Sequence, residues 1–229
     1  MTARGVIFDM DGLLIDSERA VLECWRDTAA AQSLEVDETI WLSMVGLHEA
    51  GCAGLLNAAF GVEHAERLTQ ACKVRYDRLV EGGLPLKPGV RELLQYLFDL
   101  GVPMAVATST RGERARIKLA RSGIDRYFEH VVTSSDVAHA KPAPDLYLLA
   151  AERLGIAPGE CIALEDSEFG VRAASAAGIR VIQIPDLVPA SPRSQSLATV
   201  VSSISEARPL IASFLGMENS SALSVVEAT

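Results

Sequence analysis

The sequence predicts an α/β fold in which a doubly wound parallel sheet carries an inserted, all-helical domain. Short apolar runs alternate with helical patterns along most of the chain, which is typical of βαβ units whose strands are buried on both faces. One long segment, residues 16–83, breaks this alternation because it contains helical patterns and no good strand. The 229 residues are enough for a sizeable core, either as one domain or as a domain with an insertion.

The strands of the sheet are expected where short apolar runs stand between turn residues. Runs of this kind are too short for helices and fit strands that are covered by helices on both sides. The expected strands cover residues 5–8, 102–107, 130–133, 161–164 and 180–184.

Helical patterns lie before or after these runs and are expected to cover the sheet. They occupy residues 90–100, 113–122, 145–154 and 168–177, and a last helix is expected at about residues 205–215. A glycine stands just past several of these patterns, where a left-handed residue often ends a helix. These glycines are Gly101, Gly123, Gly155 and Gly178.

The segment without strands predicts a helical insertion, which we call the cap, between the first strand and its helix. Its first pattern repeats Ala20, Cys24 and Thr28 on one face, and the stretch EGGLPLKPGV at its end is rich in glycine and proline. We therefore expect a core of residues 1–15 and 84–217 and a cap of residues 16–83. Residues 218–229 have little apolar periodicity and are expected to form a mobile tail.

The composition excludes several classes of function. The net charge of −9 is not interrupted by a basic block, so we expect no nucleic-acid partner and no anionic membrane surface. The scattered cysteines and histidines predict neither a zinc site nor a disulfide framework. The N-terminus reads as a strand rather than as a signal peptide, and no stretch approaches a membrane-spanning length. We expect a cytoplasmic monomer.

Polar residues follow the predicted strands at the points where the strands end. Ligands of open α/β sheets bind beyond the carboxyl ends of the strands, so these residues are the candidates for a functional site. Asp9, Asp11 and Gly12 follow the first run. Thr108, Ser109 and Thr110 follow the second, Lys141 lies near the third, and Glu165 and Asp166 follow the fourth.

Carboxylates that converge with hydroxyl groups and a lysine describe a site for a hard cation and an oxyanion. Clustered like charges raise one another's pKa, so such a group of acids needs a cation, a proton-transfer role or exposure to water. Mg²⁺ is typically held by one or two carboxylates together with substrate phosphate and water. The sequence therefore predicts a Mg²⁺ site that receives a phosphoryl group.

The candidate residues suggest separate roles in phosphoryl transfer. One carboxylate can attack phosphorus and form an aspartyl phosphate. A second carboxyl group, which must not be fully ionised, can then protonate the leaving oxygen. Thr108 and Ser109 precede a helix that begins near Gly112, so they can bind phosphate oxygens at its N-terminus. Pro142 favours an extended conformation for Lys141, which projects its charge toward the strand edge.

The four stretches FDMDG, ATST, AKPAPD and ALEDSEFGVRAASAAG resemble, in this order, the four motifs of the haloacid dehalogenase-like hydrolase superfamily. The resemblance implies that Asp9 is the nucleophile, Asp11 the general acid and base, and Lys141 the charge-stabilising residue. It also implies that Thr108 binds phosphate and that Asp9, the Asp11 carbonyl oxygen and Asp166 hold Mg²⁺. Glu165 would be a metal ligand or support the ligands. The insertion is similar to the small helical cap of the phosphoglycolate phosphatase and β-phosphoglucomutase branch.

Several alternatives stay open beside a phosphatase of a small phosphorylated metabolite. DMDG alone could be a solvated turn, although an EF-hand loop is excluded because its ligand positions would fall on leucines and an alanine. A dehalogenase or phosphonatase of the superfamily lacks the second aspartate of the first motif, so the presence of Asp11 argues against both. The β-phosphoglucomutase pattern has a cap histidine where Val21 stands and an arginine near residues 47–49, and both are missing here. A nonenzymatic regulatory protein that binds a phosphosugar is a further alternative. The presence of the nucleophile, the acid, the lysine and the metal carboxylate argues against it.

The roles of four residues at or near the cap are less clear from the sequence. Asp16 and Ser17 are expected mainly to cap the first cap helix, and the role of Glu18 is open. His48 lies in the VGLHEAG turn of the cap, where it could reach the substrate or bond locally.

Overall fold

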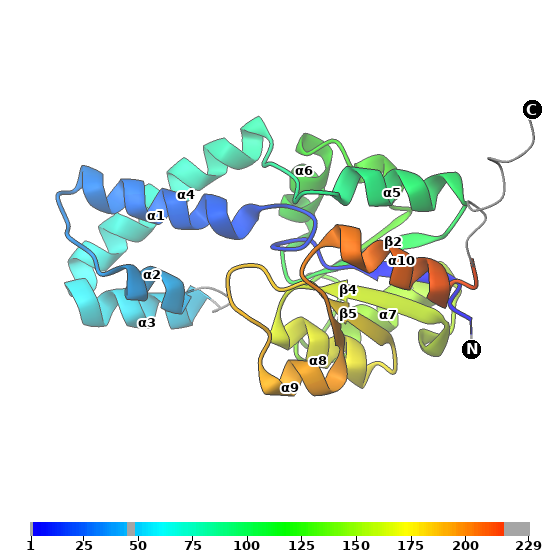
Figure 1. The fold of residues 1–229 in the computed structure, drawn as a ribbon. Coiled ribbons are helices and arrows are strands. Elements are labelled where there is room, and N and C mark those ends of the chain that lie inside the picture. Colours follow the sequence, from blue (N-terminus) through cyan, green and yellow to red (C-terminus); the bar gives the residue numbers. More distant parts are fainter. Residues whose placement is uncertain (1, 45–48, 218–229) are drawn as a thin grey trace, which may run out of the picture.

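The computed structural model describes residues 2–44 and 49–217, which form a parallel sheet between helices and a separate group of helices beside it (Figure 1). The sheet has six strands in the order β3-β2-β1-β4-β5-β6, and all pairs are parallel. The strands are β1 (Gly5–Phe8), β2 (Met104–Thr108), β3 (His130–Thr133), β4 (Cys161–Glu165), β5 (Arg180–Gln183) and β6 (Thr199–Val200). The predicted α/β class is confirmed.

Both faces of the sheet are covered, because side chains along the inner strands alternate between two hydrophobic clusters. In β1, Val6 and Phe8 belong to one cluster and Ile7 belongs to the other. One cluster is completed by α5 (Val90–Asp99), α6 (Gly112–Arg121) and α10 (Ile204–Phe214), and the other by α7 (Asp145–Leu154) and α8 (Glu168–Ala176). Figure 1 shows α5 and α10 on one side of the sheet and α7 and α8 on the other.

The strand order reverses at β1, whose neighbours are β2 on one side and β4 on the other. The chain moves outward from β1 to β3 and then returns to β4, so the connections from β1 and β4 leave the sheet in different directions. Such a switch point opens a crevice at the carboxyl ends of the two strands. The residues that follow β1 and β4 therefore lie where a ligand site is expected.

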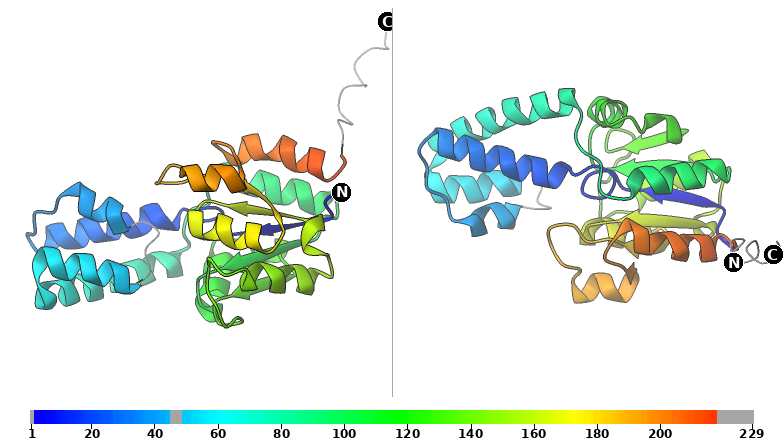
Figure 2. Two further views of the ribbon diagram at one scale, coloured as in Figure 1. Left: turned by 90° about the horizontal axis from the view of Figure 1, so that it is seen from below. Right: turned by 45° about the horizontal axis from the view of Figure 1, so that its top comes forward.

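The described residues between β1 and α5, which exclude 45–48, form four helices. These helices lie beside the sheet, as both views in Figure 2 show. They are α1 (Ser17–Ala31), α2 (Glu38–Met44), α3 (Glu49–Phe60) and α4 (Val62–Gly82). They surround their own hydrophobic cluster, in which Trp41 is stacked between Trp25 and Phe60 at centroid distances of 6.0 and 6.5 Å. This is the predicted helical insertion, while the exact limits of cap and core stay a prediction.

The two connections between the cap and the sheet run side by side. Ile15 and Leu86 form an antiparallel bridge, the amide of Asp16 donates to the carbonyl of Pro85 at 2.9 Å, and that of Lys87 to Leu14 at 3.0 Å. This pairing fixes the point at which the cap leaves the core. Within the described ranges, no helix combines the length and apolar character that crossing a bilayer requires.

Several elements differ from the sequence prediction. The structure adds the short strand β6, the helix α9 (Pro192–Leu197) and two short 3₁₀ helices, η1 (Asp125–Tyr127) and η2 (Pro158–Glu160). Both residues of β6 are exposed, so no apolar run marks this strand. The predicted left-handed glycines past the helices are confirmed, with φ between 66 and 76° at Gly101, Gly123, Gly155 and Gly178. The predicted tail, residues 218–229, lies outside the described residues.

Candidate active site

The acidic residues after β1 and β4 meet at the carboxyl ends of these neighbouring strands. Asp9 still pairs with β4, because its amide donates to the Leu164 carbonyl at 3.0 Å. Carboxylate oxygens of Asp9, Glu165 and Asp166 all lie within 4.8 Å of one another. Residues that are about 150 positions apart in the sequence are thus brought together by parallel pairing of β1 with β4.

Gly12 allows the chain to turn sharply beside this cluster. Its φ is +85°, and a Cβ atom there would lie 2.3 Å from an Asp166 carboxylate oxygen. Its amide donates to the Ile15 carbonyl at 2.9 Å, which closes the turn. A side chain at this position would therefore be strained by the backbone and would also displace the Asp166 carboxylate.

Lys141 projects into the acidic cluster from the segment between β3 and α7. Its Nζ donates to Asp9 Oδ1 at 2.5 Å, to Glu165 Oε1 at 2.6 Å and to the Ala107 carbonyl at 3.0 Å. The side chain is only 5% exposed. The lysine therefore connects the ends of β1, β2 and β4, and its charge faces the strand edge as the sequence predicts.

Glu165 is completely buried, and both of its oxygens accept hydrogen bonds from the protein. Oε1 accepts from Lys141 and from the Tyr147 hydroxyl, which lies 2.7 Å away. Oε2 accepts from the Asp166 amide at 3.1 Å and from the Ser167 amide and hydroxyl at 3.3 and 3.1 Å. These contacts favour Glu165 as a support that orients Lys141 and the start of α8 over Glu165 as a metal ligand.

Crowding and burial shift the protonation of this cluster. Burial raises the pKa of the Asp9 carboxyl to about 8, with a further rise from Glu165 and against the opposing effect of Lys141. Burial, Asp9 and Glu165 likewise raise the pKa of Asp166 well above its ordinary value. Although burial opposes its charge, Asp9 and Glu165 raise the pKa of Lys141. Asp9 and Asp166 would both be ionised more easily beside a further cation.

The donor set fits a hard divalent cation. Carboxylate oxygens are the preferred ligands of Mg²⁺ and Ca²⁺, and a group of them that is buried with raised pKa values is stabilised by such an ion. Asp9 and Asp166 are the better candidates for metal ligands, because protein donors do not occupy all of their carboxylate oxygens. Both oxygens of Glu165 already accept hydrogen bonds from the protein. The chemistry of the site thus supports a metal ion without naming it.

Asp11 lies next to this cluster but faces different partners. Its Oδ1 accepts from the Ser17 hydroxyl at 2.7 Å and from Lys118 Nζ at 2.6 Å, and its Oδ2 accepts from the Thr110 hydroxyl at 2.6 Å. Although burial acts in the opposite direction, Lys118 and the hydroxyl groups lower the pKa of Asp11. These contacts favour the ionised form of Asp11, whereas the sequence predicts a carboxyl group that does not ionise fully. The two differ because the sequence did not reveal the lysine.

Thr108 and Ser109 lie at the end of β2, beside β1. Thr108 is 1% exposed, and its hydroxyl accepts from the Thr110 amide at 3.0 Å. Ser109 is exposed, and α6 starts three residues later at Gly112. Both residues thus stand before a helix N-terminus as predicted, on the same sheet edge as Asp9.

Asp16 and Ser17 do not cap the first cap helix through their side chains. Asp16 occupies the N-cap position of α1 without a side-chain capping bond, and its carboxylate lies 3.5 Å from both Arg19 and Lys87. Ser17 donates to Asp11 instead. Charged partners from a distant segment have outweighed the local capping interaction. Glu18 is next to them, and burial, Asp11 and Asp186 raise its pKa to about 7.

Sequence reasoning missed Lys118 and Tyr147, which contact the candidate residues. Lys118 lies on the buried face of α6 together with Ala115 and Leu119, and a lysine on an apolar face was the available signal. Tyr147 lies on the buried face of α7 and had no signal beyond its hydroxyl group. His48 lies outside the described residues, so its predicted role stays a prediction.

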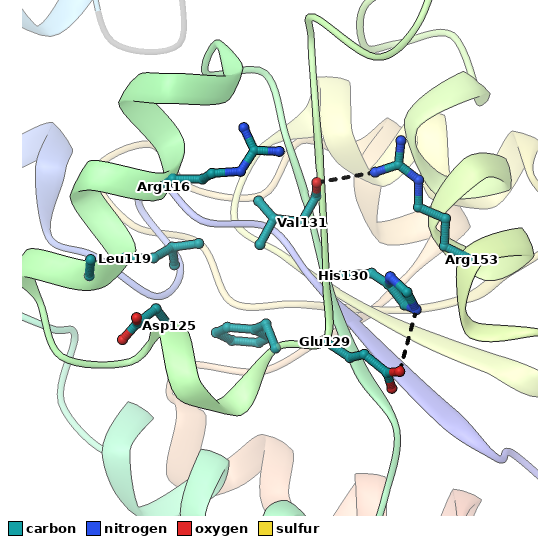
Figure 3. Close-up of a pocket in the computed structure, with 9 residues that line it drawn as sticks. Arg116, Leu119, Asp125, Glu129, His130, Val131 and Arg153 are labelled. Atoms are coloured by element: carbon teal, nitrogen blue, oxygen red, sulfur yellow. Dashed lines mark hydrogen bonds and ion pairs between the residues drawn. The ribbon is translucent and has the colours of Figure 1, made fainter.

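A hollow of about 430 Å³ lies away from these acids, beside the edge strand β3 (Figure 3). Arg153 donates there to the Val131 carbonyl at 3.3 Å, and His130 lies 4.0 Å from Glu129. These polar groups bind one another and do not converge on a common point. The hollow therefore does not compete with the acidic cluster as a candidate active site.

Comparison with known proteins gives consistent matches over most of the chain. A family model described as haloacid dehalogenase-like hydrolase matches residues 3–178. A phosphorylated carbohydrates phosphatase of Thermotoga maritima is 34% identical over 77% of this chain and 82% of its own length. The fructose-1-phosphate phosphatase YqaB of Escherichia coli is 35% identical over 79% of this chain and 95% of its own.

A solved structure agrees with these matches. The crystal structure of a HAD family hydrolase from Deinococcus radiodurans, with bound phosphate and sodium, superposes with a TM-score of 0.81 at 29% identity. The match covers 94% of this chain and 97% of that chain. It therefore includes the helices beside the sheet as well as the sheet itself.

Proposed function

The chain belongs to the haloacid dehalogenase-like hydrolase family, and from this premise we propose that it is a Mg²⁺-dependent phosphatase of a small phosphorylated metabolite. Sugar phosphates are the favoured substrates, with sugar-acid phosphates and phosphoglycolate-like esters as related candidates. The observation that carries the proposal is the meeting of Asp9, Asp166 and Lys141 at one sheet edge. The names of the two matched phosphatases support a phosphorylated carbohydrate as the substrate.

In the first step, a carboxylate oxygen of Asp9 attacks phosphorus in line with the leaving oxygen. A bond forms between Asp9 and phosphorus, and the bond from phosphorus to the leaving oxygen breaks. Asp11 gives a proton to that oxygen, a step that requires the protonated form, which its present contacts disfavour. The products are a free alcohol and an aspartyl phosphate on Asp9. Lys141 holds Asp9 in position and offsets negative charge beside the phosphoryl group.

In the second step, water hydrolyses the aspartyl phosphate. Asp11 takes a proton from the water molecule, whose oxygen bonds to phosphorus, and the bond between phosphorus and Asp9 breaks. Inorganic phosphate leaves, and Asp9 and Asp11 return to their starting forms. The present contacts of Asp11, which favour its ionised form, suit this step.

Residues at the ends of β2 and β4 complete the proposed site. Thr108 and Ser109 would bind phosphoryl oxygens before the N-terminus of α6. Asp9, the carbonyl oxygen of Asp11 and Asp166 would hold Mg²⁺, with Glu165 as a support or a further ligand. When bound, the cation would neutralise charge on the phosphoryl group and keep the nucleophile ionised. His48 stays a candidate substrate contact from the cap.

Replacement of the nucleophile tests this proposal. Asp9→Asn should abolish hydrolysis of p-nitrophenyl phosphate, because an amide cannot form the phosphoenzyme, while circular dichroism shows a folded chain. Asp125→Asn on the exposed 3₁₀ helix is the matched control and should keep wild-type activity. Activity of Asp9→Asn at the control level would remove Asp9 from its role and with it the proposed function.

A substrate panel identifies the metabolite class and separates hydrolysis from phosphoryl transfer within one molecule. Phosphorylated sugars, sugar acids, nucleotides and glycolate-type esters would be assayed with and without Mg²⁺, and with a bisphosphate activator. We expect Mg²⁺-dependent release of inorganic phosphate from sugar phosphates. Isomerised sugar phosphate that appears only with the bisphosphate would contradict a phosphatase and indicate a phosphomutase.

A further inference from the structure

Each aspartate of the FDMDG segment has its own buried lysine. Lys141 contacts Asp9 at 2.5 Å, and Lys118 contacts Asp11 at 2.6 Å. Both lysine side chains are 5% exposed. A buried ammonium group is costly unless it is paired, so each contact strongly restricts where its lysine and its carboxylate can lie.

Lys118 reaches Asp11 from the second turn of α6, the helix that follows β2. The remaining donors to Asp11 are the hydroxyl groups of Ser17 and Thr110, which can rotate and can also accept hydrogen bonds. Lys118 can only donate, and it carries a charge. Of the three contacts it is therefore the one that most firmly sets the direction of the Asp11 carboxylate.

The cap contributes to the same contact through Tyr76 on α4. Lys118 Nζ lies 5.3 Å from the centroid of the Tyr76 ring, which is the range of a cation–π interaction. Arg114, one turn earlier on α6, lies at the same distance from this ring and is paired with Asp77 at 2.6 Å. A residue of the cap thus packs directly on the lysine that binds Asp11, while Arg114 makes a similar contact without touching Asp11.

We infer that Lys118 is a positioning residue that aims the Asp11 carboxyl group at the leaving oxygen and the attacking water, with the cap residue Tyr76 covering the contact. The inference rests on the proposed function, because it assigns Lys118 a role through Asp11. A purely structural ion pair would stabilise the fold and leave the chemistry of the leaving group unaffected. The two roles therefore differ in what they predict for esters that need a proton on the leaving oxygen.

The test compares p-nitrophenyl phosphate, whose leaving group needs little protonation, with phenyl phosphate, whose leaving group needs more. Lys118→Met should lower kcat for phenyl phosphate by about 10²-fold, the lower end of typical general acid–base contributions, with KM little changed. The loss for p-nitrophenyl phosphate should be clearly smaller. Arg114→Met is the matched control from the same helix and should leave both rates and their ratio unchanged.

Two further comparisons separate a role through Asp11 from a loss of folding. Lys118→Arg keeps the positive charge and should retain part of the phenyl phosphate rate that Lys118→Met loses. If Lys118→Met does not fold, the arginine variant allows the same comparison of the two esters. Asp11→Asn should show at least as large a loss, and adding Lys118→Met to it should lower the rate no further. Tyr76→Leu should reproduce the selective loss at smaller size.

The outcomes distinguish this inference from the proposed function. Three results would overturn the role of Lys118: equal losses for both esters, additive effects of Lys118→Met and Asp11→Asn, or unchanged rates in Lys118→Met. If Asp11→Asn still lowered the rates, the proposed function would stand. An Asp11→Asn enzyme with unchanged rates would overturn the role of Asp11 in both.

Discussion

Asp166 shows at the scale of one residue how the fold creates a need for a cation. Burial and the neighbouring Asp9 and Glu165 raise the pKa of its carboxyl group well above the ordinary value, so its charged form is disfavoured in the folded chain. A divalent ion reverses this preference, because it adds attraction to each carboxylate. Metal binding and folding stability should therefore be coupled at this position.

We expect Mg²⁺ to stabilise the wild-type protein, by about 2.7 kcal/mol at a free concentration of roughly 100 times Kd, or a melting-temperature rise of roughly 5–10 °C. Asp166→Asn should lose most of this rise. In EDTA, the variant should melt at the wild-type temperature or above it, since the amide removes a repulsive charge. Melting curves with and without Mg²⁺ measure both effects, and Asp125→Asn should behave as wild type. A full Mg²⁺ response in Asp166→Asn would exclude it as a ligand.

The residues that sequence analysis found and missed differ in where their partners lie. Asp9 and Asp166 stand directly after strand-like runs, and Lys141 lies in the connection between β3 and α7, so the topology of a parallel sheet places all three at one edge. Lys118 and Tyr147 lie inside helices, and their contacts depend on how those helices rotate against the sheet. The capping role of Asp16 was wrong for a related reason, because Lys87 and Arg19 arrive from outside the local segment or from the next turn.

At the scale of one element, the start of α8 is shaped around Glu165. Gly170 lies in the first turn of this helix, and its amide donates to the N-cap hydroxyl of Ser167 at 3.1 Å. A Cβ atom at Gly170 would lie 1.7 Å from Glu165 Oε1 and 1.9 Å from Cδ, closer than any atoms can approach without displacement. Helix and strand can therefore pack at this distance only with glycine.

Gly170→Ala should displace Glu165, which holds Lys141, and thereby lower both activity and stability. We expect a loss of about 1–3 kcal/mol, as for other overpacked sites, and a fall in kcat of at least about 10-fold because Lys141 is misplaced. Gly159→Ala, where a Cβ atom meets nothing within 4 Å, is the control. Urea unfolding and p-nitrophenyl phosphate turnover measure the two effects. Wild-type turnover in Gly170→Ala would show that Glu165 does not position Lys141.

The last helix gives a prediction that should affect stability alone. At the N-terminus of α10, the Ser203 hydroxyl accepts from the Glu206 amide at 3.2 Å, and the Glu206 carboxylate accepts from the Ser202 amide at 2.9 Å. Ser203→Ala should cost about 1 kcal/mol, or roughly 2–4 °C in Tm, with unchanged kcat. Ser213→Ala, at an exposed position of the same helix, should change neither. An altered kcat in Ser203→Ala would mean that α10 acts on the site.

Element prediction succeeded where burial leaves a periodic pattern. β1, β3 and the helices α7 and α8 are marked by apolar residues that the sheet covers, and their predicted limits differ from the observed ones by at most one residue. β6 and α9 carry no such pattern, because β6 is exposed and α9 buries a serine, Ser194. β6 is the edge strand of the sheet and α9 packs against α8, so both lie at the periphery, where little apolar surface is needed.

At the scale of the whole molecule, the sheet and the cap each have their own hydrophobic core. The sheet has clusters on both faces, while the cap helices enclose a cluster of their own around Trp41, which is 2% exposed. The two segments that connect the cap to the core are joined by the β-bridge between Ile15 and Leu86, so both connections lie at the same place. This arrangement allows the cap to lose order without loss of the sheet.

Trp41→Ala tests whether the cap is a separate folding unit. The substitution removes the ring between Trp25 and Phe60 and should cost about 3–5 kcal/mol of local stability, as for other buried aromatic residues. Hydrogen exchange followed by mass spectrometry should show lost protection in α1 and α4, while amides of β1 and β4 exchange as in the wild type.

Leu42→Ala, the neighbouring position at 45% exposure, should keep protection in both parts and serves as the control. Because the carboxylates of the proposed active site stand at the end of the sheet, the Trp41→Ala protein should still hydrolyse p-nitrophenyl phosphate, with a larger loss for sugar phosphates that depend on cap contacts. Equal loss of protection in cap and sheet would show instead that the chain unfolds as one unit. In that case the cap could not reorganise independently, and substrate selection by the cap would have to work through a fixed orientation.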